Sequence, residues 1–204
     1  MMRLGEEESE ILGIMFGDGS IYRTKRKLKV EITGHKMDDR EYMLNHVAPL
    51  FLRVYGVRMR VSYRRDSNTM RLYTYSQEVA MRLHMLGMPI GPKSRATLLP
   101  HADVEPESFI RGLFDTDGCV YRKYGCYAQV QFKSIARELM EFVRNTLILM
   151  GFHSSRIILD ETRYKFYLCR QEEVRRFFEF IRPANPKHLK RLAGIWSRKP
   201  TGTA

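Results

Sequence analysis

A pattern of nine residues occurs twice in this chain, once in each half. Residues 11–19 read ILGIMFGDG and residues 110–118 read IRGLFDTDG, so each copy is an apolar segment that contains a glycine and ends in Asp-Gly. Apolar residues at helical spacing, followed by an Asp-Gly turn, predict a buried helix that ends near the aspartate. One such helix indicates only a core element, but two copies indicate a duplicated unit with one carboxylate, Asp18 or Asp117, in each half.

The segments that follow each copy also repeat in the same order. In the first half the pattern predicts strands at about residues 20–24, 27–33, 58–64 and 70–75, and helices at 38–54 and 77–86. In the second half it predicts strands at about 119–123, 127–133, 155–159 and 164–168, and helices at 136–150 and 172–180. The order αββαββα, found twice, predicts an α+β fold of two repeats related by a pseudo-twofold axis. We expect an N-terminal repeat over residues 1–99, a proline-containing linker over 100–106 and a C-terminal repeat over 107–204.

Small residues four positions apart predict that the two motif helices pack against each other. They are Gly13 with Gly17, and Gly112 with Thr116. If the helices run side by side, Asp18 and Asp117 emerge next to each other. Two adjacent carboxylates repel unless a cation lies between them, and hard oxygen ligands suit magnesium.

The charge of the chain indicates a polyanionic partner. The formal net charge is +12, from 35 Lys and Arg against 23 Asp and Glu, and 44% hydrophobic residues suffice for a real core. The cysteines Cys119, Cys126 and Cys169 lack the spacing of a zinc site. The acidic N-terminus does not resemble a signal peptide, and no apolar run approaches the length of a membrane span, so we expect an intracellular protein with no membrane partner.

The predicted strands alternate between an apolar face and a polar, mostly basic face. Any half-exposed sheet alternates in this way, but here every strand pair carries Arg, Lys, Gln or Tyr on its polar side. Arg and Lys bind phosphates and guanine edges, and Gln binds adenine, so this face fits a DNA major groove. The residues expected to contact DNA are Tyr22, Thr24, Lys27, Lys29, Arg58, Arg60, Ser62, Arg64, Arg71, Tyr73, Tyr121, Lys123, Gln129, Lys133, Arg163, Lys165 and Tyr167.

With these features the chain resembles the single-chain, two-repeat homing endonucleases of the LAGLIDADG family, from about Ser9 to about Trp196. The family motif is matched at Gly13, Asp18 and Gly19, and again at Gly112, Asp115, Asp117 and Gly118. The first copy departs from it at Phe16, where an acidic residue is usual; that position is not the metal ligand in the family.

The resemblance implies an enzyme, a divalent-metal-dependent DNA endonuclease. It implies a monomer whose two antiparallel sheets form a saddle on double-stranded DNA and which makes a double-strand break in a long target. Because the halves have diverged, we expect that target to be asymmetric. The resemblance assigns Mg²⁺, or another divalent cation, to Asp18 and Asp117, aided by the backbone carbonyls of Gly17 and Thr116.

The resemblance also implies further catalytic residues in each half. A basic residue is expected near each scissile phosphate, and Lys93 and Lys187 each follow a proline in matched segments. Glu31 and Gln131, on the matched second strands, are expected to hold metal-bound water or to contact the scissile region.

Other functions of the same fold remain as alternatives. A non-cleaving nucleic-acid-binding protein, either an RNA maturase or a DNA-binding regulator, often lacks one or both motif aspartates, and this chain keeps both. An RNA-binding module with exposed aromatic residues does not explain the paired acidic motifs. The chain starts Met1-Met2 and ends Thr203-Ala204, without the residues that an intein needs, so we expect a free-standing or intron-encoded enzyme. Its compartment is expected to be an archaeal or bacterial cytoplasm or an organelle.

Overall fold

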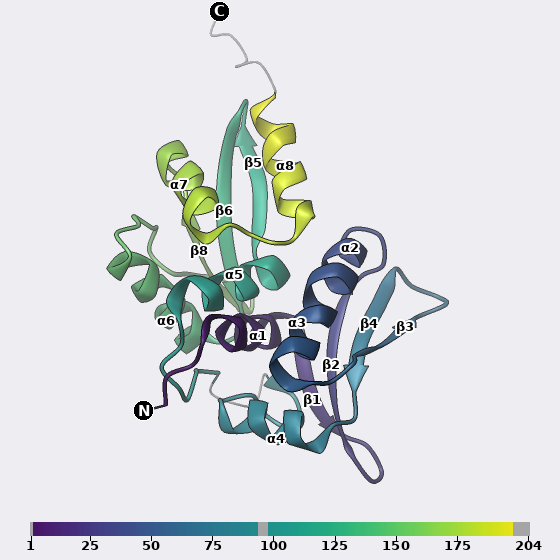
Figure 1. Cartoon of the computed structure of the whole chain (residues 1–204). Coiled ribbons are helices and arrows are strands. Elements are labelled where there is room, and N and C mark those ends of the chain that lie inside the picture. Colours follow the sequence, from purple (N-terminus) through teal and green to yellow (C-terminus); the bar gives the residue numbers. More distant parts are fainter. Residues whose placement is uncertain (1, 94–97, 198–204) are drawn as a thin grey trace, which may run out of the picture.

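The protein, represented by a computed structural model, is described over residues 2–93 and 98–197, and it is built from two repeats of the same topology. The repeats meet at helices α1 (Glu6–Gly17) and α5 (Pro106–Asp117), which lie together at the centre of the molecule (Figure 1). No helix in the described ranges is long and apolar enough to cross a membrane. The α+β fold predicted from the sequence is confirmed.

The N-terminal repeat is a four-stranded antiparallel sheet in the order β1-β2-β4-β3. Its strands are β1 (Gly19–Arg23), β2 (Leu28–His35), β3 (Arg60–Tyr63) and β4 (Thr69–Thr74). The long helix predicted between β2 and β3 is divided into α2 (Arg40–Tyr42), a π-helical turn η1 (Met43–Val47) and α3 (Ala48–Tyr55). It ends at Gly56, whose φ of 66° is easy for a residue without a Cβ. Helix α4 (Gln77–Met85) completes the repeat.

The C-terminal repeat has the matching sheet order β5-β6-β8-β7. Its elements are β5 (Cys119–Tyr124), β6 (Tyr127–Ser134), α6 (Arg137–Leu149), β7 (Ile158–Asp160), β8 (Arg163–Leu168), α7 (Gln171–Ile181) and α8 (Pro186–Trp196). Helix α8 is an addition to the predicted elements. Asn185 caps it by accepting a hydrogen bond from the backbone N–H of Lys187 at 3.2 Å, and Pro186 occupies its first turn, where a missing N–H costs nothing.

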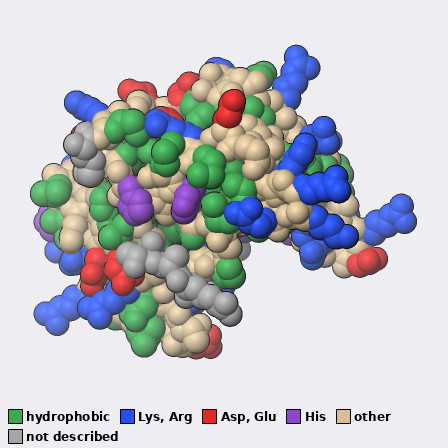
Figure 2. Space-filling model, turned by 90° about the horizontal axis from the view of Figure 1, so that it is seen from below, with side chains coloured by type: hydrophobic (Ala, Val, Ile, Leu, Met, Phe, Trp, Pro, Cys, Tyr) green, Lys and Arg blue, Asp and Glu red, His purple; other side chains and the backbone are tan. Residues whose placement is uncertain are grey.

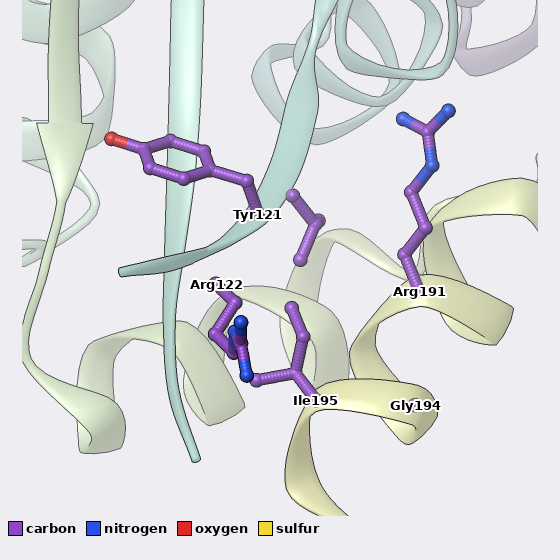
Figure 3. Close-up of a pocket in the computed structure, with 6 residues that line it drawn as sticks. Tyr121, Arg122, Arg191, Gly194 and Ile195 are labelled. Atoms are coloured by element: carbon purple, nitrogen blue, oxygen red, sulfur yellow. The ribbon is translucent and has the colours of Figure 1, made fainter. Parts of the chain in front are cut away.

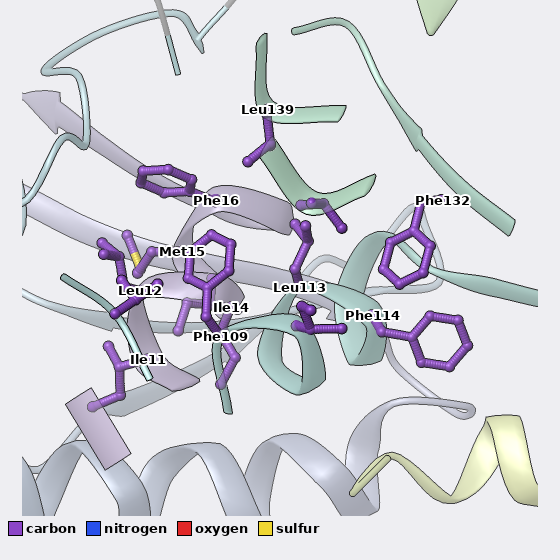
Figure 4. Close-up of a cluster of buried hydrophobic side chains, with 14 of the residues drawn as sticks. Ile11, Leu12, Ile14, Met15, Phe16, Phe109, Leu113, Phe114, Phe132 and Leu139 are labelled. Atoms are coloured by element: carbon purple, nitrogen blue, oxygen red, sulfur yellow. The ribbon is translucent and has the colours of Figure 1, made fainter. Parts of the chain in front are cut away.

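Glycines bring the backbones of α1 and α5 into direct contact, as the spacing predicts. A Cβ at Gly13 would lie 2.1 Å from the carbonyl oxygen of Phe109, and one at Gly112 would lie 2.1 Å from that of Glu10. The contact is thus reciprocal, which is the mark of a pseudo-twofold axis between the helices. Figure 4 shows the apolar side chains of both helices in one continuous core. Burying this core is the main force that holds the repeats together.

The polar faces of the two sheets are less open than the alternating pattern predicts. Leu28, Val30 and Ile32 are buried, as expected for the apolar face of β2. Lys29 and Gln129, however, are also buried, and they occupy equivalent places in β2 and β6. Period-two alternation fixes which face a side chain is on, but it does not show whether neighbours on that face cover it.

Candidate functional site

The two motif aspartates lie where the paired helices end. Asp18 follows the last residue of α1, and Asp117 is the last residue of α5. The helix ends stay close, because a Cβ at Gly17 would lie 2.0 Å from the Thr116 hydroxyl oxygen. Two helix C-termini therefore converge, each with its negative dipole end and its own carboxylate. This end of the helix pair attracts cations.

The electrostatics of this pair of carboxylates agree with that geometry. Burial, and then the charge of Asp117, raise the pKa of Asp18 to about 7, although Lys187 and Lys93 act in the opposite direction. Burial also raises the pKa of Asp117, against the nearby charges of Lys93, Arg163 and Lys187. Asp117 is surrounded by many protein atoms, but part of its surface is open to solvent, and Asp18 is half-buried. Since water reaches both carboxylates and screens them, a ligand can reach them too.

Lys93 lies at the same helix end. Its ammonium donates hydrogen bonds to the carbonyl oxygens of Phe16, at 2.9 Å, and of Gly17. Burial lowers the pKa of Lys93 to about 8, and the two aspartates only partly offset this effect. The Gly17 carbonyl, expected as a metal ligand, is therefore engaged by Lys93 in this structure.

Lys187, the second predicted lysine, is held differently. Its ammonium lies 2.9 Å from a carboxylate oxygen of Asp39, which belongs to the other repeat. Lys187 is still close enough to lower the pKa of both Asp18 and Asp117. The structure thus brings together the two aspartates and the two lysines that were predicted as a site.

Glu31 and Gln131 lie beside this centre on equivalent strands. Glu31 pairs in register with Ser20, and Gln131 with Cys119; each partner is two residues beyond its motif aspartate. Neither side chain hydrogen-bonds to an aspartate in the described parts of the chain, so their predicted role as water holders stays a prediction.

The polar faces around the centre hold internal networks. In the N-terminal sheet Glu31 accepts hydrogen bonds from Lys29 at 2.5 Å and from Tyr22 at 3.1 Å, and Arg71 lies 3.4 Å away. The Lys29 ammonium also lies 4.3 Å from the ring centroid of Tyr73. Lys29 is therefore an internal partner of Glu31 more than a free contact residue.

The C-terminal sheet carries mainly neutral partners in the same places. Gln129 accepts a hydrogen bond from Tyr121 at 2.6 Å, and Gln131 donates to the hydroxyl of Tyr167 at 3.1 Å. At the edge of the sheet, Asp160 lies 2.8 Å from both Lys133 and Lys165. These bonds fix the predicted contact residues in place.

The remaining predicted contact residues are at least partly open to solvent. Among them Lys27, Arg58, Arg60, Arg64, Lys123 and Arg163 are exposed, and Thr24 and Ser62 are half-buried. Figure 2 shows Lys and Arg side chains gathered on the side of the molecule where the strands of the N-terminal repeat lie. Such a surface attracts a polyanion.

Sequence reasoning missed two residues of the site, Asp39 and Asn185. Both are buried, and the Asn185 amide donates a hydrogen bond to Asp39 at 2.9 Å. The Asn185-Pro186 pair could have predicted the start of α8, because Asn caps helices and Pro is common in the first turn. The similarity of this segment to Gly91-Pro92-Lys93 favours a loop instead. No sequence signal predicts the pairing with Asp39, because it depends on how the repeats dock.

The donor set suits a divalent cation with few protein ligands. Asp18 and Asp117 offer hard oxygen atoms, and their mutual repulsion would be relieved by a positive charge between them. Within residues 2–93 and 98–197 no group of three or more His, Cys, Asp and Glu side chains could hold a metal ion. A cation here would take its other ligands from carbonyls, water or a bound phosphate.

A surface pocket of about 320 Å³ lies elsewhere, between β5 and α8 (Figure 3). Ile195 points from α8 toward β5, and Arg191 also lines the pocket from α8. The lining includes neither aspartate and neither lysine of the site, so this pocket is separate from the aspartate centre.

Comparison with known proteins places the fold. Residues 105–182 match the family model for a LAGLIDADG-like domain. Variants of the homing endonuclease I-DmoI share 19% sequence identity over 86% of this chain and 94% of theirs, with a TM-score of 0.62. The LAGLIDADG meganuclease I-AabMI, solved bound to uncleaved DNA, shares 13% identity over 95% of this chain and 90% of its own, with a TM-score of 0.64.

A third protein with this fold is full-length DUF199/WhiA from Thermotoga maritima. It shares 20% identity over 98% of this chain and 62% of its own, with a TM-score of 0.59. No curated protein sequence matches the chain. Residues 105–182 therefore resemble a LAGLIDADG-like domain, and the chain has the two-repeat fold of single-chain homing endonucleases, as its sequence predicted.

Proposed function

We propose that this protein is a site-specific homing endonuclease, which makes a metal-dependent double-strand break in a long, asymmetric DNA target. The observation that carries the proposal is the pair Asp18 and Asp117, which lie at converging helix ends, where the charge of Asp117 helps to raise the pKa of Asp18. I-DmoI has been solved with its target DNA in the presence of Mn, Mg and Ca, which supports a divalent cation here. The protein would act as a monomer, since one chain supplies both halves of the site.

The residues of the site have complementary roles. A divalent cation held by Asp18 and Asp117 would lower the pKa of a bound water and neutralise charge on the scissile phosphate. Lys93 and Lys187 place positive charge near both aspartates, where negative charge would develop as the phosphodiester bond breaks. With a pKa of about 8, Lys93 can also exchange a proton near neutral pH.

The sheets supply the specificity in this proposal. Equivalent positions that stay partly open to solvent differ between the repeats: Thr33 corresponds to Lys133, and Arg71 to Lys165. Two half-sites with different side chains prefer different base sequences, so the target is expected to lack a palindrome.

Cleavage of a selected DNA tests the proposal. Duplexes that bind the protein are selected from a random library and then incubated with Mg²⁺, Mn²⁺ or Ca²⁺. We expect Asp18→Asn and Asp117→Asn to lower the cleavage rate at least about 100-fold while binding is kept, because the metal contribution amounts to several kcal/mol. Asp103→Asn, which removes an exposed carboxylate from the linker, is the matched control.

Thermal unfolding separates lost chemistry from lost structure. Ionised Asp18 is destabilising, because its pKa in the folded protein lies above the ordinary value, so Asp18→Asn is expected to raise the Tm at pH 8. Tight, specific binding without cleavage in any of the three metals would contradict the enzyme and favour a non-cleaving maturase or regulator of the same fold.

A further inference from the structure

The start of α8 is fixed by hydrogen bonds to the buried carboxylate of Asp115. One carboxylate oxygen accepts from the backbone N–H of Ala184 at 2.8 Å, and the other accepts from that of Asn185 at 3.0 Å. Asp115 and Asn185 are both fully buried. The acidic residue before the catalytic aspartate of the second motif therefore anchors α8 and does not face the reacting centre.

The same anchor extends into the N-terminal repeat. The Asn185 amide donates to the carbonyl of Asp115 at 3.0 Å and to Asp39 Oδ1 at 2.9 Å. The second oxygen of Asp39 accepts the backbone N–H of His35 at 2.8 Å. Asp39 is thus fixed by both repeats, near the place where the start of α8 approaches α2 (Figure 1).

Lys187 is the third partner of Asp39. Its ammonium lies 2.9 Å from the Oδ1 atom that also accepts from Asn185, and the Lys187 and Asp39 side chains are only 14% and 11% exposed. Burial would raise the pKa of Asp39, but the hydrogen bonds and charge of Lys187 lower it below its ordinary value. The Asp39 carboxyl is therefore ionised at neutral pH, and a shielded ion pair of this kind holds a flexible lysine in one position.

The other lysine of the site is not paired with a carboxylate in the described part of the chain. Lys93 donates to the carbonyls of Phe16 and Gly17, which belong to the helix of its own repeat. The first motif has Phe16 at the position of Asp115, so it offers no carboxylate to build an equivalent network. Within residues 2–93 and 98–197, Lys187 is thus the one of the two lysines that a residue of the opposite repeat positions.

We propose that Asp39 is a positioning residue of the N-terminal repeat that holds Lys187 of the C-terminal repeat at one scissile phosphate. The proposal rests on the endonuclease function proposed above. Lys93 is held at the end of α1, whereas Lys187 belongs to the C-terminal repeat and pairs with Asp39, so each lysine is assigned to one DNA strand. Loss of Asp39 then slows the cleavage of one strand only, and the enzyme becomes a nickase.

Single-turnover cleavage of the selected duplex, labelled separately on each strand, tests this proposal. We expect Asp39→Asn to slow one strand about 10- to 100-fold, the usual effect of a misplaced catalytic group, and the other strand by less than about threefold. Lys187→Met should slow the same strand, and the double variant should be no slower than Lys187→Met alone. Glu41→Gln is the matched control, because Glu41 pairs with α8 through the exposed Lys190, at 3.8 Å, and not through Lys187.

A second variant covers the case in which Asp39→Asn unfolds. Asn185→Ser keeps a helix-capping oxygen but loses the amide bond to Asp39, and it should slow the same strand to a smaller degree. Equal slowing of both strands, or additive effects of Asp39→Asn and Lys187→Met, would overturn the proposal. If the wild-type protein cuts neither strand, the proposed endonuclease function itself is wrong. If the wild type cuts both strands and the variants show no strand bias, only the role of Asp39 is wrong.

Discussion

The two repeats carry different residues two positions before their motif aspartates, Phe16 in α1 and Asp115 in α5. Phe16 is buried and packs edge-to-face on Phe109, with ring centroids 5.7 Å apart. Asp115 is equally buried, but it accepts two backbone N–H groups at the start of α8. The same motif position is thus used for apolar packing in one repeat and for anchoring a helix in the other.

This difference separates the parts of the motif that act in chemistry from the parts that act in structure. The first glycine of each motif, Gly13 or Gly112, and the final aspartate are the same in both repeats, and these glycines lie where the helices touch. The residue at the position of Phe16 and Asp115 instead depends on the element that it packs against. That element is the Phe109 ring for Phe16 and the start of α8 for Asp115. Divergence at this position therefore leaves the aspartate pair unchanged and instead changes how each lysine is held.

The largest effects are expected where the repeats agree. Gly112→Ala and Gly13→Ala each place a methyl group 2.1 Å from a backbone carbonyl of the other helix, so the helices must move apart. We expect each to lower the free energy of unfolding by about 3 kcal/mol, the upper range for overpacking, and to reduce cleavage through a wider aspartate pair. Urea unfolding measures the loss. Similar losses in both variants support the pseudo-twofold packing, and a loss in only one would contradict it.

The next effect is expected where the sheets differ. Glu31→Gln removes the negative charge beside the nearly buried ammonium of Lys29. Because this leaves the ammonium without its partner, we expect the free energy of unfolding to fall by about 2–3 kcal/mol. Gln131→Glu makes the reverse change at the equivalent position, where the Tyr167 hydroxyl can serve a carboxylate, and should cost about 1 kcal/mol or less.

Chemical denaturation of both variants and of the double swap measures this asymmetry. If the two single changes cost the same, the charged network of the N-terminal sheet has no structural role. In that case Lys29 would be free to contact DNA, as the alternating pattern predicts.

The packing of α1 against α5 and the positions of the strands could be predicted from the sequence, because both follow from local sequence patterns. Glycine spacing predicts the close packing of α1 and α5, and period-two alternation locates most strand residues within a few positions. Local sequence patterns do not predict the pairing of Asp39 with Lys187, because these residues belong to different repeats and meet only when the repeats dock. They likewise do not show that Lys29 and Gln129 are covered, since that depends on the lengths and partners of neighbouring side chains.

A buried histidine beside the Asp115 anchor gives the C-terminal repeat a pH dependence of its own. His188 is fully buried against Phe114, and neither ring nitrogen has a hydrogen-bond partner in the described part of the chain. Burial, and then the charge of Lys187, lower the pKa of His188 from 6.5 to about 3. Between these values the unfolded chain binds the proton and the folded protein does not, so acid destabilises the fold.

His188→Phe removes this contribution and can pack in the same aromatic cluster. Relative to the variant, the wild type should lose up to about 1.4 kcal/mol per pH unit below pH 6.5, or about 2 kcal/mol by pH 5. The difference between the two unfolding free energies, measured at pH 7, 6 and 5, isolates His188 from Asp18 and Asp115, whose raised pKa values act in the opposite direction. A difference that does not change with pH would mean that water reaches the histidine.

The smallest effect is expected at a glycine that does not pack against the other repeat. Gly194 lies within α8, and a Cβ there would have no atom within 4 Å. Gly194→Ala should therefore raise the free energy of unfolding by about 0.5–1 kcal/mol, because alanine loses less backbone entropy in a helix and meets no obstacle. Gly112→Ala is expected to lose stability and Gly194→Ala to gain it. This contrast tests whether the paired helices need glycine because their backbones approach closely. A loss of stability in Gly194→Ala would mean that α8 contacts another surface at this position.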